Sequence, residues 1–271
     1  GPYYVAEWYP GWFDNWGKKH AEVSAENSAK TLDKLLAAGI SVNMYMFHGG
    51  TTRGFMNGAN MSANDPFSPQ VSSYDYDAPL DEAGNPTEKF YAFREVIKKY
   101  LPKDQKLPEI PKPAPVMAVE HIKFTSFASL YDILPKPVES EKPLSFEDLN
   151  QAYGFVLYRT VISESGTLKI DGLRDFASVF LNGNKIKDLD RRLNENEANL
   201  INVKENSVLD ILVENNGRIN YGTFLTDNRK GIIKGVSLNN RELSGWKMYR
   251  LPFSDLKEIV CKLLGLSFNW F

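Results

Sequence analysis

The sequence is poor in the residues that form disulfides, metal centres and membrane spans. Its 271 residues include one cysteine, Cys261, and three histidines, so we expect neither an intrachain disulfide nor a cysteine-based zinc site. No apolar run approaches the roughly 20 residues that a membrane helix requires, and no basic segment leads into an apolar one as in a secretory signal. Neither glycine-rich stretch has the spacing of a phosphate loop or a dinucleotide fingerprint. These absences predict a protein without a metal, a cofactor or a membrane partner.

Clustered positive charge is missing as well. The formal net charge is -2 at pH 7, and no segment concentrates lysine and arginine. Binding to a nucleic-acid backbone needs such a cluster. The sequence therefore predicts no nucleic-acid partner.

Aromatic residues, in contrast, are concentrated at the beginning of the chain. Three of the five tryptophans lie within residues 2–17, where a single carboxylate, Glu7, follows a short apolar run. Flat rings beside a carboxylate suit a sugar, because its C–H faces stack on rings while its hydroxyls need polar partners. The same residues fit an apolar strand edge with an incidental glutamate equally well.

Residues 1–100 alternate between strand and helix patterns. Ser24 can cap a helix that Gly39 stops, and residues 40–47 read as a strand. Its alternating faces would be Val42, Met44 and Met46 on one side and Asn43, Tyr45 and Phe47 on the other. A second helix, capped by Thr87, ends before Pro102. Strand, helix and strand in about fifty residues predict a parallel β/α unit.

The segment between these elements offers several polar candidates. His48 follows the strand and could bind a substrate hydroxyl or make a structural hydrogen bond, and no Gly-x-Ser-x-Gly elbow supports a histidine-based triad. The loop 53–86 is long enough to predict a functional segment. It carries Asp75 and Asp77, for which turn-bonding or solvent-facing roles are favoured over a metal site, because alternation in an extended segment would send them to opposite faces.

In the second half of the chain, apolar residues alternate with a period of two, as in β-strands. Residues 104–119 are rich in proline and read as a linker between residues 1–103 and a domain at residues 120–255. Short strands at residues 155–162, 166–170, 177–181 and 208–213, with a hairpin signal at Asn182-Gly183, predict a jelly-roll-like β-sandwich. The tail, residues 256–271, has a weak helical period, ends on aromatics and suggests truncation.

Three stretches, residues 6–17, 43–51 and 73–84, resemble in order and spacing the seventh and eighth strand regions of the glycoside hydrolase family 35 β-galactosidases. Segments of the second half also resemble that family's first β-domain; they are residues 153–160, 189–192, 213–222 and 227–232. The resemblance implies an α/β plus all-β chain. Its parts would be the last two β/α units of a (β/α)8 TIM barrel, followed by the β-sandwich.

The resemblance also implies roles for individual residues. Glu7 matches the catalytic nucleophile of the family. The substrate pocket would be lined by Tyr9, Trp12, Tyr45, Tyr74 and Tyr76. His48 and residues 52–54 depart from the family pattern, which leaves the exact substrate open.

A retaining glycosidase needs a second carboxyl group as acid and base, and the family's Asn-Glu motif for that residue has no counterpart here. We therefore expect a fragment of a retaining β-galactosidase that is inactive by itself. Its partners would be a β-galactoside oligosaccharide or polysaccharide and either the missing barrel segment or a second copy. An extracytoplasmic location fits such an enzyme. The alternative is a non-catalytic carbohydrate-binding or structural β-sandwich module.

Overall fold

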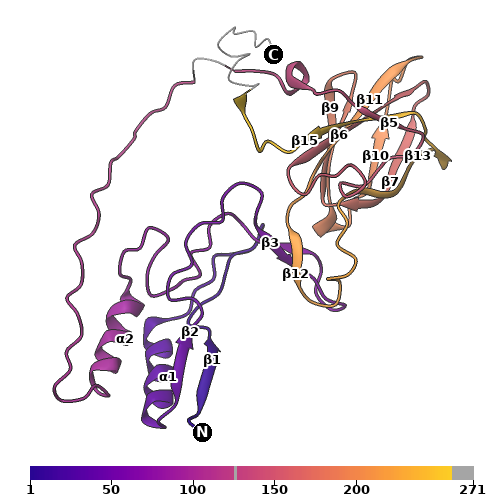
Figure 1. The fold of residues 1–271 in the computed structure, drawn as a ribbon. Coiled ribbons are helices and arrows are strands. Elements are labelled where there is room, and N and C mark those ends of the chain that lie inside the picture. The colour runs from indigo at the N-terminus through magenta and orange to yellow at the C-terminus, as the bar shows by residue number, and fades with distance from the viewer. Residues whose placement is uncertain (125–126, 258–271) are drawn as a thin grey trace. The chain divides into compact units, whose positions relative to one another are not determined.

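The computed structural model describes residues 1–124 and 127–257. The chain forms two compact units, shown in Figure 1. Unit 1 consists of Gly1–Asn57 and Pro69–Val119, and unit 2 consists of Gly58–Ser68 and the chain from Glu120 onward. Most of the tail, from residue 258, lies outside the described residues, and with it the predicted helical period.

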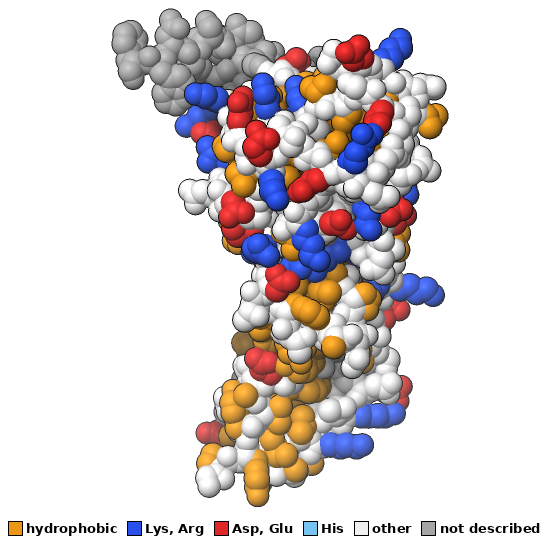
Figure 2. Space-filling view, turned by 90° about the vertical axis from the view of Figure 1, so that its right-hand side faces the viewer, with side chains coloured by type: hydrophobic (Ala, Val, Ile, Leu, Met, Phe, Trp, Pro, Cys, Tyr) orange, Lys and Arg blue, Asp and Glu red, His pale blue; other side chains and the backbone are white. Residues whose placement is uncertain are grey.

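Unit 1 contains two parallel strands covered by two helices. Strands β1 (Tyr4–Trp8) and β2 (Ser41–Met44) pair in parallel, and helices α1 (Ala25–Ala37) and α2 (Glu88–Lys98) pack on one face of them. Their shared core is formed by Trp8, Leu32, Val42, Met44, Phe93 and Val96. This is the predicted β/α arrangement. Hydrophobic side chains also gather on the surface of unit 1, as Figure 2 shows.

Strand β2 is shorter than predicted. It ends at Met44, and the chain turns at Tyr45 and Met46. Met46 therefore leaves the face of Val42 and Met44 and packs in a separate cluster with Phe13 and Tyr76. The prediction that all three residues share one face is wrong, because strand alternation holds only while the strand continues.

The helix ends follow their sequence signals in part. Ser24 caps α1 by accepting a hydrogen bond from the Asn27 backbone N–H at 3.2 Å, and Gly39 follows the helix with φ of +70°. Thr87 precedes α2 as predicted but makes no side-chain cap. Its hydroxyl donates to the Pro79 carbonyl at 2.9 Å instead, which ties the preceding loop to the start of the helix.

Unit 2 is a sandwich of antiparallel sheets. One sheet has the order β5-β15-β6-β11-β8-β9 and the other β10-β7-β13-β14. The strands are β5 (Val138–Ser140), β6 (Phe155–Ile162), β7 (Gly166–Arg174), β8 (Phe176–Leu181), β9 (Asn184–Asp190), β10 (Glu197–Leu200), β11 (Ser207–Glu214), β13 (Gly231–Leu238), β14 (Arg241–Glu242) and β15 (Trp246–Leu251). Short 3-10 helices occupy Leu130–Ile133 and Arg191–Leu193.

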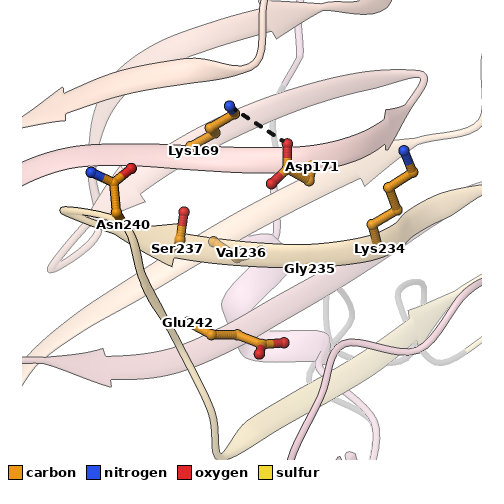
Figure 3. Close-up of a pocket in the computed structure, with 8 residues that line it drawn as sticks. All are labelled: Lys169, Asp171, Lys234, Gly235, Val236, Ser237, Asn240 and Glu242. Carbon is orange, nitrogen blue, oxygen red and sulfur yellow. Dashed lines mark ion pairs between the residues drawn. The ribbon is translucent and has the colours of Figure 1, made fainter.

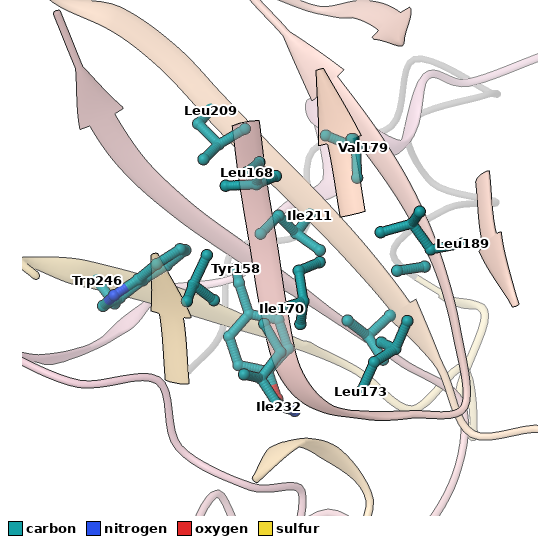
Figure 4. Packing of buried hydrophobic residues seen from close by; sticks show 14 of the residues in the cluster. Tyr158, Leu168, Ile170, Leu173, Val179, Leu189, Leu209, Ile211, Ile232 and Trp246 are labelled. Carbon is teal, nitrogen blue, oxygen red and sulfur yellow. Dashed lines mark hydrogen bonds between the residues drawn. The ribbon is translucent and has the colours of Figure 1, made fainter. Parts of the chain in front are cut away.

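Side chains from both sheets form one buried cluster. Figure 4 shows Leu168 and Ile170 of β7 beside Leu209 and Ile211 of β11. The predicted strands are all present, and Asn182 and Gly183 form the β8–β9 turn with φ of 49° and 79°, as a tight hairpin requires.

Part of the long loop predicted at residues 53–86 belongs to unit 2. Strands β3 (Gly58–Asn60) and β4 (Ser68–Pro69) form a sheet with β12 (Arg218–Tyr221) in the order β12-β3-β4. Phe67 is 3% exposed. The guanidinium carbon of Arg191 lies 4.3 Å, and Nζ of Lys230 4.7 Å, from its ring centroid. This cation–π packing gives residues 58–68 a place in unit 2 that the proline pattern did not predict.

Within residues 1–124 and 127–257, no helix combines the length and the apolar composition of a membrane span.

Candidate active site

Glu7 lies on the side of the β1–β2 pair that the helices leave uncovered. The pairing is in register at Val5 and again at Trp8, but β1 has one residue more than β2 between these points. Such a bulge re-aims the side chains that follow it. Trp8 therefore packs with Val42 on the helix side, and Glu7 remains exposed on the other side.

A hydroxyl group orients the Glu7 carboxylate. The Tyr9 hydroxyl donates to Oε2 of Glu7 at 2.5 Å. Next to this pair, Nδ2 of Asn43 donates to the Ala6 carbonyl at 3.0 Å. Asn43 is a positioning residue to which the sequence had assigned no role, although it stands in one of the three family-like stretches. Together these bonds hold the Glu7 carboxylate and the backbone before it in place.

The five predicted pocket residues come together next to Glu7. The ring centroid of Tyr9 lies 5.5 Å from that of Trp12 and 6.0 Å from that of Tyr45. The Tyr76 centroid lies 5.7 Å from that of Tyr45 and 5.4 Å from that of Tyr74. Such tilted and edge-to-face contacts are those that aromatic rings prefer. Tyr9, Trp12 and Tyr45 are exposed and Tyr76 is buried, so the set has an open surface and a fixed base.

Two glycines allow the loop that carries Tyr74 and Tyr76 to approach β1 and β2. A Cβ atom on Gly11 would collide with the carbonyl oxygen of Tyr76, and one on Gly49 would collide with that of Tyr74. Tyr76 itself has φ of 66°, a conformation that non-glycine residues rarely adopt. Glycine is thus required at positions 11 and 49, because the loop backbone comes too close for a side chain.

A buried lysine holds the same loop. Lys89 is 3% exposed; its Nζ donates to the Pro10 carbonyl at 2.9 Å and the Asp77 carbonyl at 2.6 Å, and forms an ion pair with the Asp77 carboxylate. Sequence reasoning missed this residue. A signal was present, because Lys89, Phe93 and Val96 are spaced along one face of a helix.

The two aspartates of the loop bind backbone groups. Asp75 Oδ1 accepts from the Asp77 N–H at 3.0 Å, and Asp77 Oδ2 accepts from the Val23 N–H at 2.6 Å. The prediction of a turn-bonding aspartate is confirmed for Asp75, whereas Asp77 bonds the distant Val23 and Lys89. The segment is not extended as that prediction assumed, because Asp77 has φ of 48°. Among the described residues, no group of three or more His, Cys, Asp or Glu side chains could hold a metal ion.

Glu82 and His48 are part of a neighbouring hydrogen-bonded group. Glu82 accepts from the Ser73 hydroxyl at 2.6 Å and also from the Thr51 hydroxyl. These hydrogen bonds lower the pKa of Glu82 below its usual value, and the bond from Ser73 has the largest effect. His48 Nε2 lies 3.2 Å from the Glu82 carbonyl oxygen. This contact is the structural hydrogen bond that was the alternative to a bond with a substrate hydroxyl.

Burial governs the ionisation of the inner tyrosines. It raises the pKa of Tyr74 and of Tyr76 above the usual 10.0, and the neighbouring Tyr45 adds to both shifts. Tyr9 and Glu7 raise the pKa of Tyr76 further. Both phenols are therefore neutral hydrogen-bonding groups over the whole physiological range.

A pH titration should reveal this burial. We expect Tyr74 and Tyr76 to keep their protons above pH 10.0, the usual pKa of a tyrosine. Since their folded pKa values exceed the unfolded ones, they contribute stability that is present below pH 10 and lost as the pH rises through and beyond it. Phenolate absorbance would measure the ionisation, with Tyr74→Phe and Tyr76→Phe identifying the share of these two tyrosines in the late component. Ionisation of every tyrosine in one step near pH 10 would contradict the expectation.

Two family models match the two halves of the chain. Residues 1–100 match the family model described as glycosyl hydrolases family 35, and residues 143–252 match the model described as the first all-beta domain of beta-galactosidase. These matches, together with the similarity of the relatives described next, support the resemblance of the chain to the family 35 glycosyl hydrolases.

Curated relatives cover almost the whole chain. It is 41% identical to a beta-galactosidase of Xanthomonas manihotis over 255 residues, which are 93% of this chain and 42% of that protein. The corresponding values are 40% identity, 94% and 39% for a beta-galactosidase of Bos taurus, and 42%, 93% and 39% for one of Mus musculus. The chain thus spans about two fifths of the length of these relatives.

Proposed function

We propose that the chain carries the nucleophile and part of the galactose pocket of a retaining β-galactosidase. The observation that carries the proposal is the Tyr9–Glu7 hydrogen bond of 2.5 Å at the edge of the aromatic cluster. It places one exposed, oriented carboxylate beside ring surfaces on which a sugar can stack. The name shared by the relatives, beta-galactosidase, supports galactose as the sugar.

In this mechanism Glu7 attacks the anomeric carbon of a terminal β-galactoside. A bond forms between a Glu7 oxygen and that carbon, while the bond from the carbon to the aglycone oxygen breaks and its electron pair goes to that oxygen. A second carboxylic acid protonates the departing oxygen. Water then hydrolyses the galactosyl ester, and the second carboxylate takes up the proton of that water. Tyr9 would hold Glu7 in line, and Trp12, Tyr45, Tyr74 and Tyr76 would form the wall around the sugar.

We further propose that the acid/base carboxylate lies outside these 271 residues. The two carboxyl groups of a retaining enzyme stand roughly 5 to 5.5 Å apart. The carboxylates of the loop beside the site are engaged elsewhere: Asp77 pairs with Lys89, Glu82 binds Ser73, and Asp81 accepts from the Asn85 N–H at 2.7 Å. Freeing any of them would break the bond just named.

The open edges of β1 and β2 are where the remaining part of the enzyme would attach. Among the described residues these strands form a sheet of two, so each has one open edge, and such edges readily pair with other strands. Further β/α units of a TIM barrel are the proposed occupant, and a second copy is the alternative. An extracytoplasmic location also remains a proposal, since it rests on the type of enzyme.

Covalent trapping tests the role of Glu7. A 2-fluoro-β-galactoside with a dinitrophenolate leaving group should transfer its fluorogalactosyl group to Glu7, because this phenolate departs without a proton. Peptide mapping by mass spectrometry would locate the label. We expect no label in Glu7→Gln and unchanged labelling in the matched control Glu22→Gln. A label on another residue, or none on the unaltered chain, would refute the proposed role.

A further inference from the structure

Lys89 is a buried charge of unit 1 that the proposed mechanism does not use. It is 3% exposed, and three acceptors surround the three N–H donors of its ammonium group: the Pro10 carbonyl, the Asp77 carbonyl and the Asp77 carboxylate. Burying an ammonium group is costly unless it is paired and hydrogen-bonded. Since an apolar side chain would avoid that cost, the bonds themselves are what this charge contributes.

The lysines on the outer face of the β10-β7-β13-β14 sheet have a different environment. Figure 3 shows Lys169 paired with Asp171 of β7 at 3.9 Å, beside Lys234 of β13. The side chains of the pair are 42% and 50% exposed, and exposed pairs of this kind contribute little to stability. The hollow that these residues line is polar surface and indicates no ligand. Lys89 differs because water cannot take over its bonds.

The acceptors of Lys89 belong to two segments that carry the proposed site. Pro10 directly follows Tyr9, and Asp77 directly follows Tyr76. Tyr9 orients the proposed nucleophile at the end of β1, whereas Tyr76 is the buried base of the aromatic cluster. One ammonium group therefore connects the strand of the nucleophile to the loop of the pocket wall.

The loop needs such a restraint because its backbone has an uncommon conformation. Tyr76 and Asp77 have φ of 66° and 48° in succession, and residues other than glycine keep such angles only where surrounding contacts impose them. Lys89 binds both the carbonyl and the carboxylate of Asp77, and the Val23 N–H donates to the same carboxylate at 2.6 Å. The restraint thus acts on the residue directly after Tyr76.

The two segments are as close as backbone contact permits. A Cβ atom on Gly11 would collide with the carbonyl oxygens of Tyr76 and Asp77. On the other side of this contact, the carbonyls of Pro10 and Asp77 both accept from Lys89. Without the ammonium group, these buried oxygens would lose their donor and would be stabilised by moving apart toward water. The loop, and Tyr76 with it, would then withdraw from β1.

We propose that Lys89 is a positioning residue whose ammonium group sets the distance between the Glu7 carboxylate and the pocket wall formed by Tyr76. This inference rests on the proposed role of Glu7 and assigns Lys89 no contact with the sugar. A displacement of about 1 Å can slow a reaction about 10²-fold. Affinity should change less, because the other rings of the cluster still contact the sugar. The expected signature is slower attack at nearly unchanged affinity.

The 2-fluoro-β-galactoside with the dinitrophenolate leaving group measures both quantities on the full chain. The rate of labelling at increasing reagent concentration gives a limiting rate and a half-saturating concentration. We expect Lys89→Met to lower the limiting rate at least about tenfold and to change the half-saturating concentration less than about threefold. Lys98→Met is the matched control, since Lys98 lies on the same helix with its side chain 50% exposed, and it should change neither quantity.

Gly11→Ala alters the same separation and leaves the buried charge in place. Its methyl group would push the carbonyls of Tyr76 and Asp77 away from β1, so the limiting rate should again fall without a matching change in the half-saturating concentration. Amide hydrogen exchange in α1 and α2 reports whether unit 1 is folded in each variant. If Lys89→Met does not fold, Gly11→Ala decides the question.

The outcomes separate this inference from the proposed function. A label on Glu7 of the unaltered chain, with an unchanged limiting rate in the folded variant, would overturn the role of Lys89 and leave the nucleophile in place. A change in the half-saturating concentration alone would also overturn it, because Tyr76 would then act in binding only. Absence of a label on Glu7 of the unaltered chain would overturn both proposals.

Discussion

The 271-residue chain is expected to hydrolyse a nitrophenyl β-galactoside roughly 10²- to 10⁴-fold more slowly than a family member with both carboxylates, since that is the range that general acid–base catalysis contributes. The physical reason is that the proposed nucleophile, Glu7, would attack the anomeric carbon, whereas no described carboxylate of the neighbouring loop is free to protonate the leaving oxygen. Steady-state rates for the chain and for a full-length relative would measure the difference.

The leaving group provides the internal control for this experiment. A dinitrophenolate departs without a proton, so the chain should lose much less rate with the dinitrophenyl substrate than with the nitrophenyl one. A loss that is equal for both would mean that the pocket, and not the proton donor, is deficient. Turnover comparable to that of the full-length enzyme and abolished by Glu7→Gln would contradict the proposal that the proton donor lies outside these 271 residues.

The features that the sequence predicts well are those that short segments determine. Ser24 caps α1 because its side chain reaches an N–H three residues away, and Asn182-Gly183 forms a turn because both residues adopt positive φ readily. The aromatic cluster was also predictable in composition, since Tyr9 and Trp12 stand next to Glu7 in the chain. Their roles toward a sugar stay predictions.

The features that escaped prediction depend on contacts between distant segments. Lys89 is buried because two carbonyls from separate segments, those of Pro10 and Asp77, meet at its ammonium group. Residues 58–68 enter unit 2 because β12, more than 150 positions along the chain, pairs with β3. The composition of a long polar loop does not indicate such a partner strand. A domain boundary inferred from prolines alone therefore misses the insertion of residues 58–68 into unit 2.

Asp175 is the centre of the network that receives this loop. It is 1% exposed, and its two oxygens accept from Arg191 at 2.7 Å and from Lys230 at 2.6 Å. Burial lowers the pKa of Lys230 to about 8, although the carboxylate of Asp175 acts in the opposite direction. Since Arg191 and Lys230 both flank the ring of Phe67, the charge on Asp175 keeps two cations in place around the inserted loop.

Replacing Asp175 by asparagine is expected to destabilise unit 2 by about 3–5 kcal/mol, because removing one partner leaves a buried charge without compensation. Hydrogen exchange of the β6 and β11 amides, which are central in the larger sheet, would report the unfolding free energy of this unit. The matched control is Asp171→Asn, since the Lys169–Asp171 pair is 3.9 Å long with both side chains about half exposed; it should cost less than about 1 kcal/mol.

A double variant determines whether the charge or the packing is responsible. In Asp175→Asn with Lys230→Met, the buried ammonium is removed together with its partner, and the methionine still fills the space beside Phe67. We expect this double variant to recover part of the stability, because an apolar side chain carries no desolvation penalty at this position. If the two losses simply add, or if Asp175→Asn costs no more than Asp171→Asn, then shape complementarity around Phe67, and not the ion network, holds residues 58–68 in unit 2.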